Sequence, residues 1–280
     1  MQSASRPVVA TPDKILRIEY LSPPGPVSMA EHWFEIASVD HFWVRRRFAV
    51  LQRLAGQRIL AAKDLAEVGC GHGLLQKQVE DAFGKEVSGF DLNESALRRN
   101  VSGRSKLYCY DILQRDGELR EGFDLIFLFD VLEHISDESG FLQALLFHLS
   151  PLGSLLVNVP AGQWAFSSYD DVAGHVRRYS IETLRQVMAS NGLVLKEWTY
   201  WGLPLVPSLM LRKFWLMGKN NEKEIIRAGF DSRSIVVNRM LGVLSELEWI
   251  PQGFVGTSVM AVFDRATSDN PVFFGRESRA

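Results

Sequence analysis

A turn with glycines at alternate positions constrains this chain more than any other feature. Residues 66–75 read Ala-Glu-Val-Gly-Cys-Gly-His-Gly-Leu-Leu, and they join an apolar run to the start of an expected helix. Glycine permits positive φ and close approach of a ligand to the backbone. The first turn of the following helix offers N–H groups without partners. This strand–turn–helix unit predicts an α/β fold that binds an anionic group, here a carboxylate.

The acid before the glycines separates two classes of ligand. Glu67 lies at the expected strand tip, two residues before Gly69, where a carboxylate can hold an ammonium group. A ligand with both a carboxylate and an ammonium group carries an amino acid moiety, such as the methionine end of S-adenosylmethionine. A dinucleotide is disfavoured because Leu74 occupies the third glycine position of its fingerprint, and Gly73 comes one residue early. A purely structural turn stays open as an alternative.

Two further expected strands also end in acids. Residues 87–91 end in Asp91, where a carboxylate can accept hydrogen bonds from two ribose hydroxyls. Residues 107–112 carry Asp111, which can accept from an adenine amino group while Ile112 covers the ring. One such aspartate is often only a helix N-cap. Three acids at three successive strand ends predict a single site for a nucleoside that carries an amino acid.

With these residues, the chain resembles the class I S-adenosylmethionine-dependent methyltransferases over about 64–200 and again near 257–263. Residues 123–134 are similar to their fourth strand and its exit, and 130–134 to the ubiquinone-biosynthesis O-methyltransferase branch. The resemblance implies that S-adenosylmethionine is bound at the strand ends by Glu67, Gly69, Gly71, Gly73, Asp91, Leu92, Asp111, Ile112 and Asp130.

The alternation of apolar strands and helices over 61–200 predicts a parallel sheet with helices on both faces. The resemblance implies that this sheet is Rossmann-like and mostly parallel, with seven strands. A helical insert, 201–256, separates this core from its last strand, 257–264, and 265–280 is expected to be a flexible tail.

The first sixty residues, 1–60, form an expected N-terminal extension. Prolines argue against regular structure before about residue 26. The pattern over 29–54 is helical, with Arg45, Arg46 and Arg47 expected on its polar side.

A histidine after the expected fifth strand is the candidate catalytic base. His175 should lie over the mouth of the ligand site, and a neutral imidazole, available near pH ~6.5, can accept a hydroxyl proton. His134 is the second candidate. It lies next to Glu133, but no other histidine falls at a metal-ligand spacing, so the sequence predicts no metal site.

The residues around His175 are the candidate substrate contacts. Arg177 and Arg178 can hold a carboxylate or phosphate, and Tyr179 completes the expected set. The alternative is a structural loop whose arginines pair with Asp170 or Asp171 before a helix capped by Ser180.

The insert contains an apolar segment, 205–217, with Phe214 and Trp215 opposite a narrow polar side that carries Arg212 and Lys213. It is too short to span a membrane. Two expectations stay open: a lid that packs on the sheet or on a second copy in a homodimer, and peripheral membrane contact. Five apolar residues recur at helical spacing and are expected to pack under this lid: Val237, Met240, Leu241, Leu244 and Leu247.

Composition limits the partners. A net charge of −2 gives no overall attraction to nucleic acid. The two cysteines form no paired motif and the N-terminus has no apolar signal segment, which favours a cytoplasmic protein. We therefore expect methyl transfer to a small-molecule, glycan or lipid-linked acceptor, most simply at a hydroxyl oxygen. The alternative is a regulatory protein that binds S-adenosylmethionine without transferring its methyl group.

Overall fold

A mixed sheet forms the centre of the computed structural model, which describes residues 18–27, 38–219, 225 and 235–267. Neighbouring strands are parallel from β1 to β6, and β8 runs antiparallel to both β6 and β7. The order is β1-β4-β3-β2-β5-β6-β8-β7. The strands are β1 (Ile18–Tyr20), β2 (Leu65–Val68), β3 (Val87–Asp91), β4 (Leu107–Cys109), β5 (Phe123–Phe129), β6 (Leu149–Pro160), β7 (Leu193–Trp201) and β8 (Ser258–Arg265).

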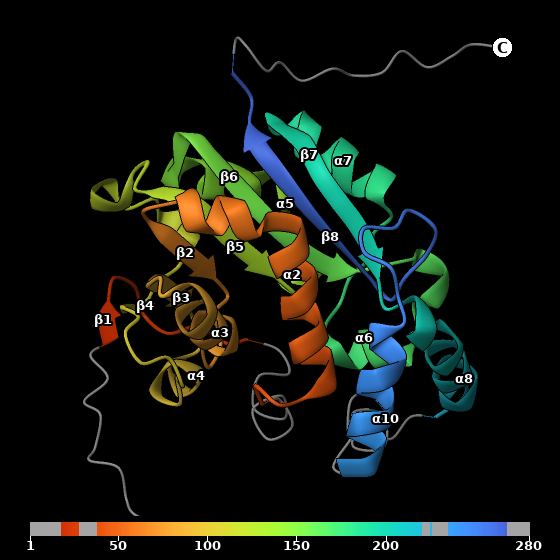
Figure 1. Cartoon of the computed structure of the whole chain (residues 1–280). Helices are drawn as coiled ribbons and strands as arrows, with labels where there is room; N and C mark the ends of the chain where they lie inside the picture. The colour runs from red at the N-terminus through yellow and green to blue at the C-terminus, as the bar shows by residue number, and fades with distance from the viewer. Residues whose placement is uncertain (1–17, 28–37, 220–224, 226–234, 268–280) are drawn as a thin grey trace, which may run out of the picture.

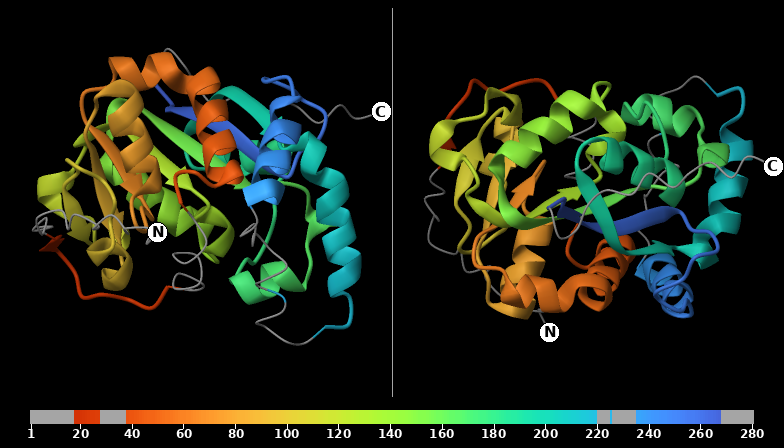
Figure 2. Two further views of the ribbon diagram at one scale, coloured as in Figure 1. Left: turned by 60° about the horizontal axis from the view of Figure 1, so that its bottom comes forward. Right: turned by 90° about the horizontal axis from the view of Figure 1, so that it is seen from above.

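Helices cover both faces of the sheet, as the alternating pattern predicted. Figure 2 shows the sheet between α2 and α3 on one side and α5 and α7 on the other. The α-helices are α2 (Phe42–Ala61), α3 (Leu74–Phe83), α4 (Glu94–Arg98), α5 (Glu138–His148), α6 (Ser168–Ala173), α7 (Ile181–Ser190), α8 (Val206–Leu216) and α10 (Ile235–Glu246). Short 3-10 helices are η1 (Ile112–Gln114), η2 (Gly117–Leu119), η3 (Leu132–His134), η4 (Gln163–Ala165) and η5 (Leu203–Leu205).

The apolar run of β5 explains why both faces must be covered. Successive side chains of a strand point to opposite faces. Ile126 and Leu128 pack in the core beneath α5 and α7, whereas Leu125 and Phe127 pack in the core beneath α2 and α3. A strand whose residues 125–129 are all apolar is stable only with helices on both sides. The predicted α/β fold with a mostly parallel sheet is confirmed.

The N-terminal extension differs from its prediction. β1 adds an eighth strand, paired with β4, within the segment expected to lack regular structure. The chain after β1 then reaches the ends of two core strands: the Ser22 hydroxyl accepts from the Asp111 N–H at 2.7 Å, and the Gly25 N–H donates to the Leu92 carbonyl at 3.1 Å. Residues 1–17 and 28–37, which include the first part of the predicted helix, lie outside the described residues.

Two arginines of α2 are buried, and the prediction of a polar side over 45–47 is wrong for them. Arg46 Nη2 lies 3.4 Å from Glu248 Oε2, and Arg47 Nη1 lies 2.6 Å from Asp130 Oδ2. The Glu248 carboxylate also accepts the backbone N–H groups of Gly202 and Leu203. The ion pair of Arg46 therefore connects α2 to the insert, and the ion pair of Arg47 connects α2 to the end of β5.

The insert lies where the parallel strands end (Figures 1 and 2), and α8 packs on α6 while α10 packs on α2. Of the apolar residues expected under a lid, Leu241 packs against the core, whereas Met240, Leu244 and Leu247 are exposed, so the prediction is wrong for these three. The Val237 side chain and most of the tail, 268–280, lie outside the description. Within the described chain, no helix is both long and apolar enough to cross a membrane.

Candidate active site

A cavity of about 780 Å³ lies at the carboxyl ends of the parallel strands. Its wall is formed by the segments that follow β2, β3, β4 and β5, with α2 and α8 at the side. The strand order reverses between β2 and β5, which is where open α/β sheets bind ligands. All the predicted cofactor residues line this cavity except Gly73. Gly73 has a positive φ and is the N-cap of α3.

The glycine turn and Glu67 form one end of the cavity. Gly69 and Gly71 both have positive φ, and a Cβ added at Gly69 would collide with the Val131 side chain. Glu67 is buried, and its Oε2 has no hydrogen-bond partner. Burial raises the pKa of this carboxyl to about 8, while Arg47 opposes that rise. An ammonium group bound here would give the carboxylate its missing partner, so the residues fit the methionine end of S-adenosylmethionine.

The pKa of Glu67 predicts a pH-dependent affinity for this ligand. Below about pH 8 the ligand-free carboxyl holds a proton, which it must release to bind an ammonium group. Affinity should therefore fall by up to about tenfold for each pH unit below about 8. Calorimetry at about pH 6 and pH 8 measures this, and Glu67→Gln should bind weakly with no such slope. A wild-type affinity that does not change between these pH values would contradict the prediction.

Asp91 and Asp111 occupy the next part of the wall. The Asp91 carboxylate accepts the backbone N–H groups of Gly71 and Asn93, both at 2.7 Å, and burial raises its pKa. A carboxylate can accept about four hydrogen bonds, so acceptor capacity remains for ribose hydroxyls. Asp111 Oδ1 accepts from the Leu113 N–H at 3.0 Å. Leu92 and Ile112 line the same part of the cavity and supply an apolar surface for an adenine ring.

Asp130 is held by two side chains that the sequence analysis did not identify. Its φ of 57° is unusual for a residue with a side chain, and its oxygens accept from Arg47 and from Asn158 Nδ2, the latter at 2.8 Å. Asn158 in turn accepts from Trp201 Nε1 at 2.8 Å. Arg47 lines the cavity near Glu67, where its guanidinium can bind the ligand's carboxylate.

The loop after α6 places His175 in the cavity wall. Its Nδ1 lies 2.8 Å from Asp170 Oδ1, and Asp170 is fully buried. Arg178 Nε donates to the same carboxylate oxygen at 2.8 Å. Burial raises the pKa of Asp170, but the hydrogen bonds from His175 and Arg178 outweigh this effect and hold that pKa below its ordinary value. The Asp170 carboxylate therefore fixes the ring of His175, with Nδ1 as the donor and Nε2 as the acceptor.

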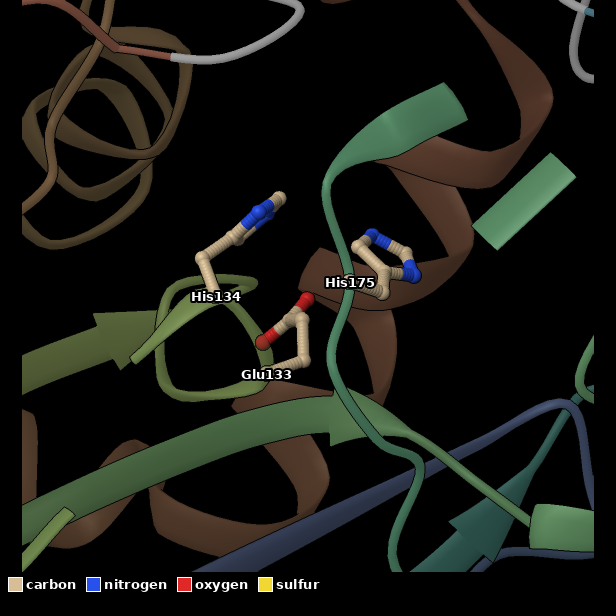
Figure 3. A group of neighbouring side chains, drawn as sticks. All are labelled: Glu133, His134 and His175. Atoms are coloured by element: carbon tan, nitrogen blue, oxygen red, sulfur yellow. The ribbon is translucent and has the colours of Figure 1, made fainter. Parts of the chain in front are cut away.

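His134 and Glu133 lie beside His175 (Figure 3), and the two imidazole ring centres are 4.8 Å apart. His134 Nδ1 lies 3.2 Å from the Gly174 carbonyl oxygen. Burial and the neighbouring His175 lower the pKa of His134 to about 4. Glu133 is fully buried, neither of its carboxylate oxygens has a hydrogen-bond partner, and burial raises its pKa well above the ordinary value.

The expected substrate contacts separate into two groups. Arg178 lines the cavity, but its guanidinium is bound to Asp170, as the alternative of a structural loop anticipated. Arg177 and Tyr179 do not line the cavity: Arg177 Nη1 lies 2.5 Å from Glu138 Oε2, and the Tyr179 hydroxyl donates to Glu138 Oε1 at 2.6 Å. Instead, Arg212 of α8 lines the cavity, 4.3 Å above the Tyr169 ring.

The model of one protein family, described as a methyltransferase domain, matches residues 32–197. The chain belongs to the methyltransferase domain family. The resemblance expected from the glycine turn and the acidic strand ends is confirmed, and with it the cofactor, S-adenosylmethionine.

Curated relatives of this methyltransferase are distant. A probable S-adenosylmethionine-dependent methyltransferase of Mycolicibacterium smegmatis is 28% identical over 167 residues, which are 56% of this chain and 62% of the relative. A ubiquinone biosynthesis O-methyltransferase of Azoarcus sp. is 33% identical over 107 residues, 34% of this chain and 43% of that protein. The chain thus spans about three-fifths of the length of the first of these relatives.

Solved structures support the fold. A putative sarcosine dimethylglycine methyltransferase from Galdieria sulphuraria superposes with a TM-score of 0.53 at 17% identity, covering 80% of this chain and 86% of that one. Haemonchus contortus phosphoethanolamine N-methyltransferase 2, in complex with S-adenosylmethionine, gives 0.51 at 19% identity, covering 80% and 53%.

Proposed function

We propose that this methyltransferase transfers a methyl group from S-adenosylmethionine to a hydroxyl oxygen of an acceptor in the same cavity. The observation that carries the proposal is the pair of His175 and Asp170 at the cavity wall. His175 lies within electrostatic range of Asp130, at the methionine end of the site. A base is therefore near the place where the acceptor must lie. The name of the ubiquinone biosynthesis relatives also favours an oxygen acceptor.

The residues of this chain bind the cofactor, orient the reacting groups and deprotonate the acceptor. Bound S-adenosylmethionine supplies a methyl group that its sulfonium already activates. Glu67 and Arg47 hold the amino acid end, and Asp91 holds the ribose. Because Asp170 accepts from Nδ1 of His175, Nε2 can take the hydroxyl proton of the acceptor. Leu205 and Leu209, from the insert, line the cavity and exclude water from the reacting atoms.

The experiment that tests this proposal is an unbiased search for the acceptor. The protein is incubated with methyl-deuterated S-adenosylmethionine and with metabolite and lipid extracts, which are then compared by mass spectrometry. We expect S-adenosylhomocysteine to form and a new O-methylated product to carry the label. A product labelled on nitrogen or carbon would overturn the hydroxyl assignment. Tight cofactor binding with no labelled product in any extract would instead support the regulatory alternative.

The outer surface of the insert suggests a lipid-linked acceptor and peripheral membrane contact. Exposed side chains on α8 include Leu211, Phe214 and Trp215, and further large apolar residues are exposed at Trp249 and Phe254. An apolar helix surface with nearby basic residues is typical of interfacial helices. The lid and the membrane contact are compatible, because Leu209 and Arg212 of the same helix line the cavity.

Vesicle flotation tests this contact. Wild-type protein should float with vesicles that contain anionic lipid, and the double variant Phe214→Asp/Trp215→Asp should lose most of this binding while S-adenosylmethionine affinity is unchanged. Leu152→Asp is the matched control, because Leu152 is equally apolar and exposed but lies near the start of β6. If the wild-type protein does not float, α8 is a lid only.

A further inference from the structure

The sequence offers no second histidine near His134, but the fold brings His175 beside it. We infer that Glu133, His134 and His175 form a binding site for one divalent transition-metal cation, open to the acceptor part of the cavity. The role of this cation toward the acceptor rests on the proposed function, but cation binding itself can be measured without methyl transfer.

The donor set has the composition of a metal site. One carboxylate oxygen and two imidazole nitrogens lie within 4.8 Å of one another, and Figure 3 shows Glu133 between the two histidines. Two histidines and one carboxylate hold Zn²⁺ or Fe²⁺ and leave positions open for a substrate oxygen. Zn²⁺ at about 2.1 Å from each atom requires them to be roughly 3.4 Å apart. Small side-chain rotations toward a shared cation would close that gap.

Glu133 supplies the independent observation. Its side chain is fully buried, yet neither carboxylate oxygen has a hydrogen-bond partner. A buried carboxylate without a partner is costly, and native proteins seldom retain one without a reason. The two neighbouring acids are already compensated, since Asp130 pairs with Arg47 and Asp170 with Arg178. Of these three acids, Glu133 is therefore the one without an ion-pair partner, and a bound divalent cation would supply that partner.

Both histidines are oriented as metal ligands usually are. Metal-bound histidines donate their other ring N–H to a carboxylate or a backbone carbonyl, which fixes the tautomer. Nδ1 of His175 faces the buried Asp170 carboxylate at 2.8 Å, and Nδ1 of His134 faces the Gly174 carbonyl oxygen at 3.2 Å. In each ring Nε2 is then the ligand atom.

A bound cation would change how the acceptor loses its proton. The acceptor's hydroxyl oxygen would coordinate the cation, which lowers the pKa of the hydroxyl and lets its proton pass to solvent. The methyl group then moves from the sulfonium to this oxygen, and an ether and S-adenosylhomocysteine result. In this state His175 is a ligand and does not act as the base, whereas in the metal-free protein its Nε2 accepts the proton.

Metal titration of the untagged, chelator-treated full chain tests the inference. Zn²⁺ binding is followed by calorimetry, and Co²⁺ binding by its visible absorption. We expect one tight site per chain in the wild-type protein, and at least about hundredfold weaker binding in Glu133→Gln and in His134→Ala. His41→Asn is the control, because Asn retains the N-cap that His41 provides for α2 and should leave metal affinity unchanged.

S-adenosylmethionine affinity is measured on the same samples, so that a misfolded variant is recognised. The inference is overturned if the wild-type protein binds no Zn²⁺ or Co²⁺. It is also overturned if Glu133→Gln and His134→Ala bind the cation as tightly as wild type while still binding S-adenosylmethionine. Cation binding without any methyl transfer would uphold the metal site and count against the proposed function alone.

Discussion

Replacement of Asp91 by alanine should weaken S-adenosylmethionine binding by at least about hundredfold. The carboxylate accepts the Gly71 N–H at 2.7 Å and so holds the glycine turn, and it lines the cavity, where its remaining lone pairs can accept from ribose hydroxyls. Hydrogen bonds to a charged group are each worth about 1.5–3 kcal/mol, so the loss of two ribose contacts alone accounts for this effect. Calorimetric titration measures the change. Gly71→Val should have a comparable effect, because a side chain would occupy the backbone approach at positive φ.

The matched control is Asp116→Ala. Asp116 caps a short 3-10 helix, as its Oδ1 accepts the Glu118 N–H at 2.9 Å, and it does not line the cavity. This variant should bind the cofactor as the wild type does. If Asp91→Ala is folded and keeps its affinity for S-adenosylmethionine, the assignment of the ribose site is wrong.

Replacement of His175 by alanine should lower turnover by roughly a hundredfold or more and leave S-adenosylmethionine affinity almost unchanged. This is the size typical of losing a general base. Asp170→Asn should also reduce turnover, because the amide cannot hold the imidazole with the same charge and tautomer. The measurement is the initial rate of S-adenosylhomocysteine formation with an acceptor that the wild-type protein methylates.

Arg177→Ala serves as the comparison for His175→Ala. Arg177 lies two residues further along the same loop, but it pairs with Glu138 outside the cavity, so its loss should leave turnover near the wild-type rate. If His175→Ala and His134→Ala both retain full turnover, neither histidine is the proton acceptor. Positioning alone would then drive the reaction, and the hydroxyl assignment would weaken with it.

The cavity at the strand ends was predictable because the residues that line it follow from local pattern. A strand that ends in Glu67 and continues into glycines, and strands that end in Asp91 and Asp111, are each visible within a few residues of sequence. Parallel strands bring their carboxyl ends to one edge, so the pattern also predicts that these acids share a cavity. The alternation of apolar segments likewise predicted the sheet and its helices.

The rest of the site depends on contacts between distant residues. Nothing local shows that Arg46 and Arg47 turn inward while Arg45 stays exposed, because the choice depends on Glu248 and Asp130. In the same way, His175 meets Glu133 and His134 only through the segment after β6, so no metal-ligand spacing is visible in the sequence and no metal site was predicted. Ser22 reaches Asp111 through an edge strand of three residues, too short for a sequence pattern to show.

The insert shows a different limit of prediction from the sequence. Apolar residues at helical spacing predict a buried face, and Leu241 packs on the core as expected. Met240, Leu244 and Leu247 follow the same spacing but are exposed. Periodicity identifies an apolar side of a helix, but the partner that covers this side must come from elsewhere. For this methyltransferase we propose that a lipid surface is that partner.

The measurement that tests this account most directly is a calorimetric titration of the full chain with S-adenosylmethionine and, separately, with NAD. We expect S-adenosylmethionine to bind at one site, more tightly at about pH 8 than at about pH 6, and we expect no binding of NAD. Asp91→Ala should abolish the S-adenosylmethionine signal. Failure of the folded wild-type protein to bind S-adenosylmethionine, or binding of NAD in its place, would contradict the assignment of this cavity.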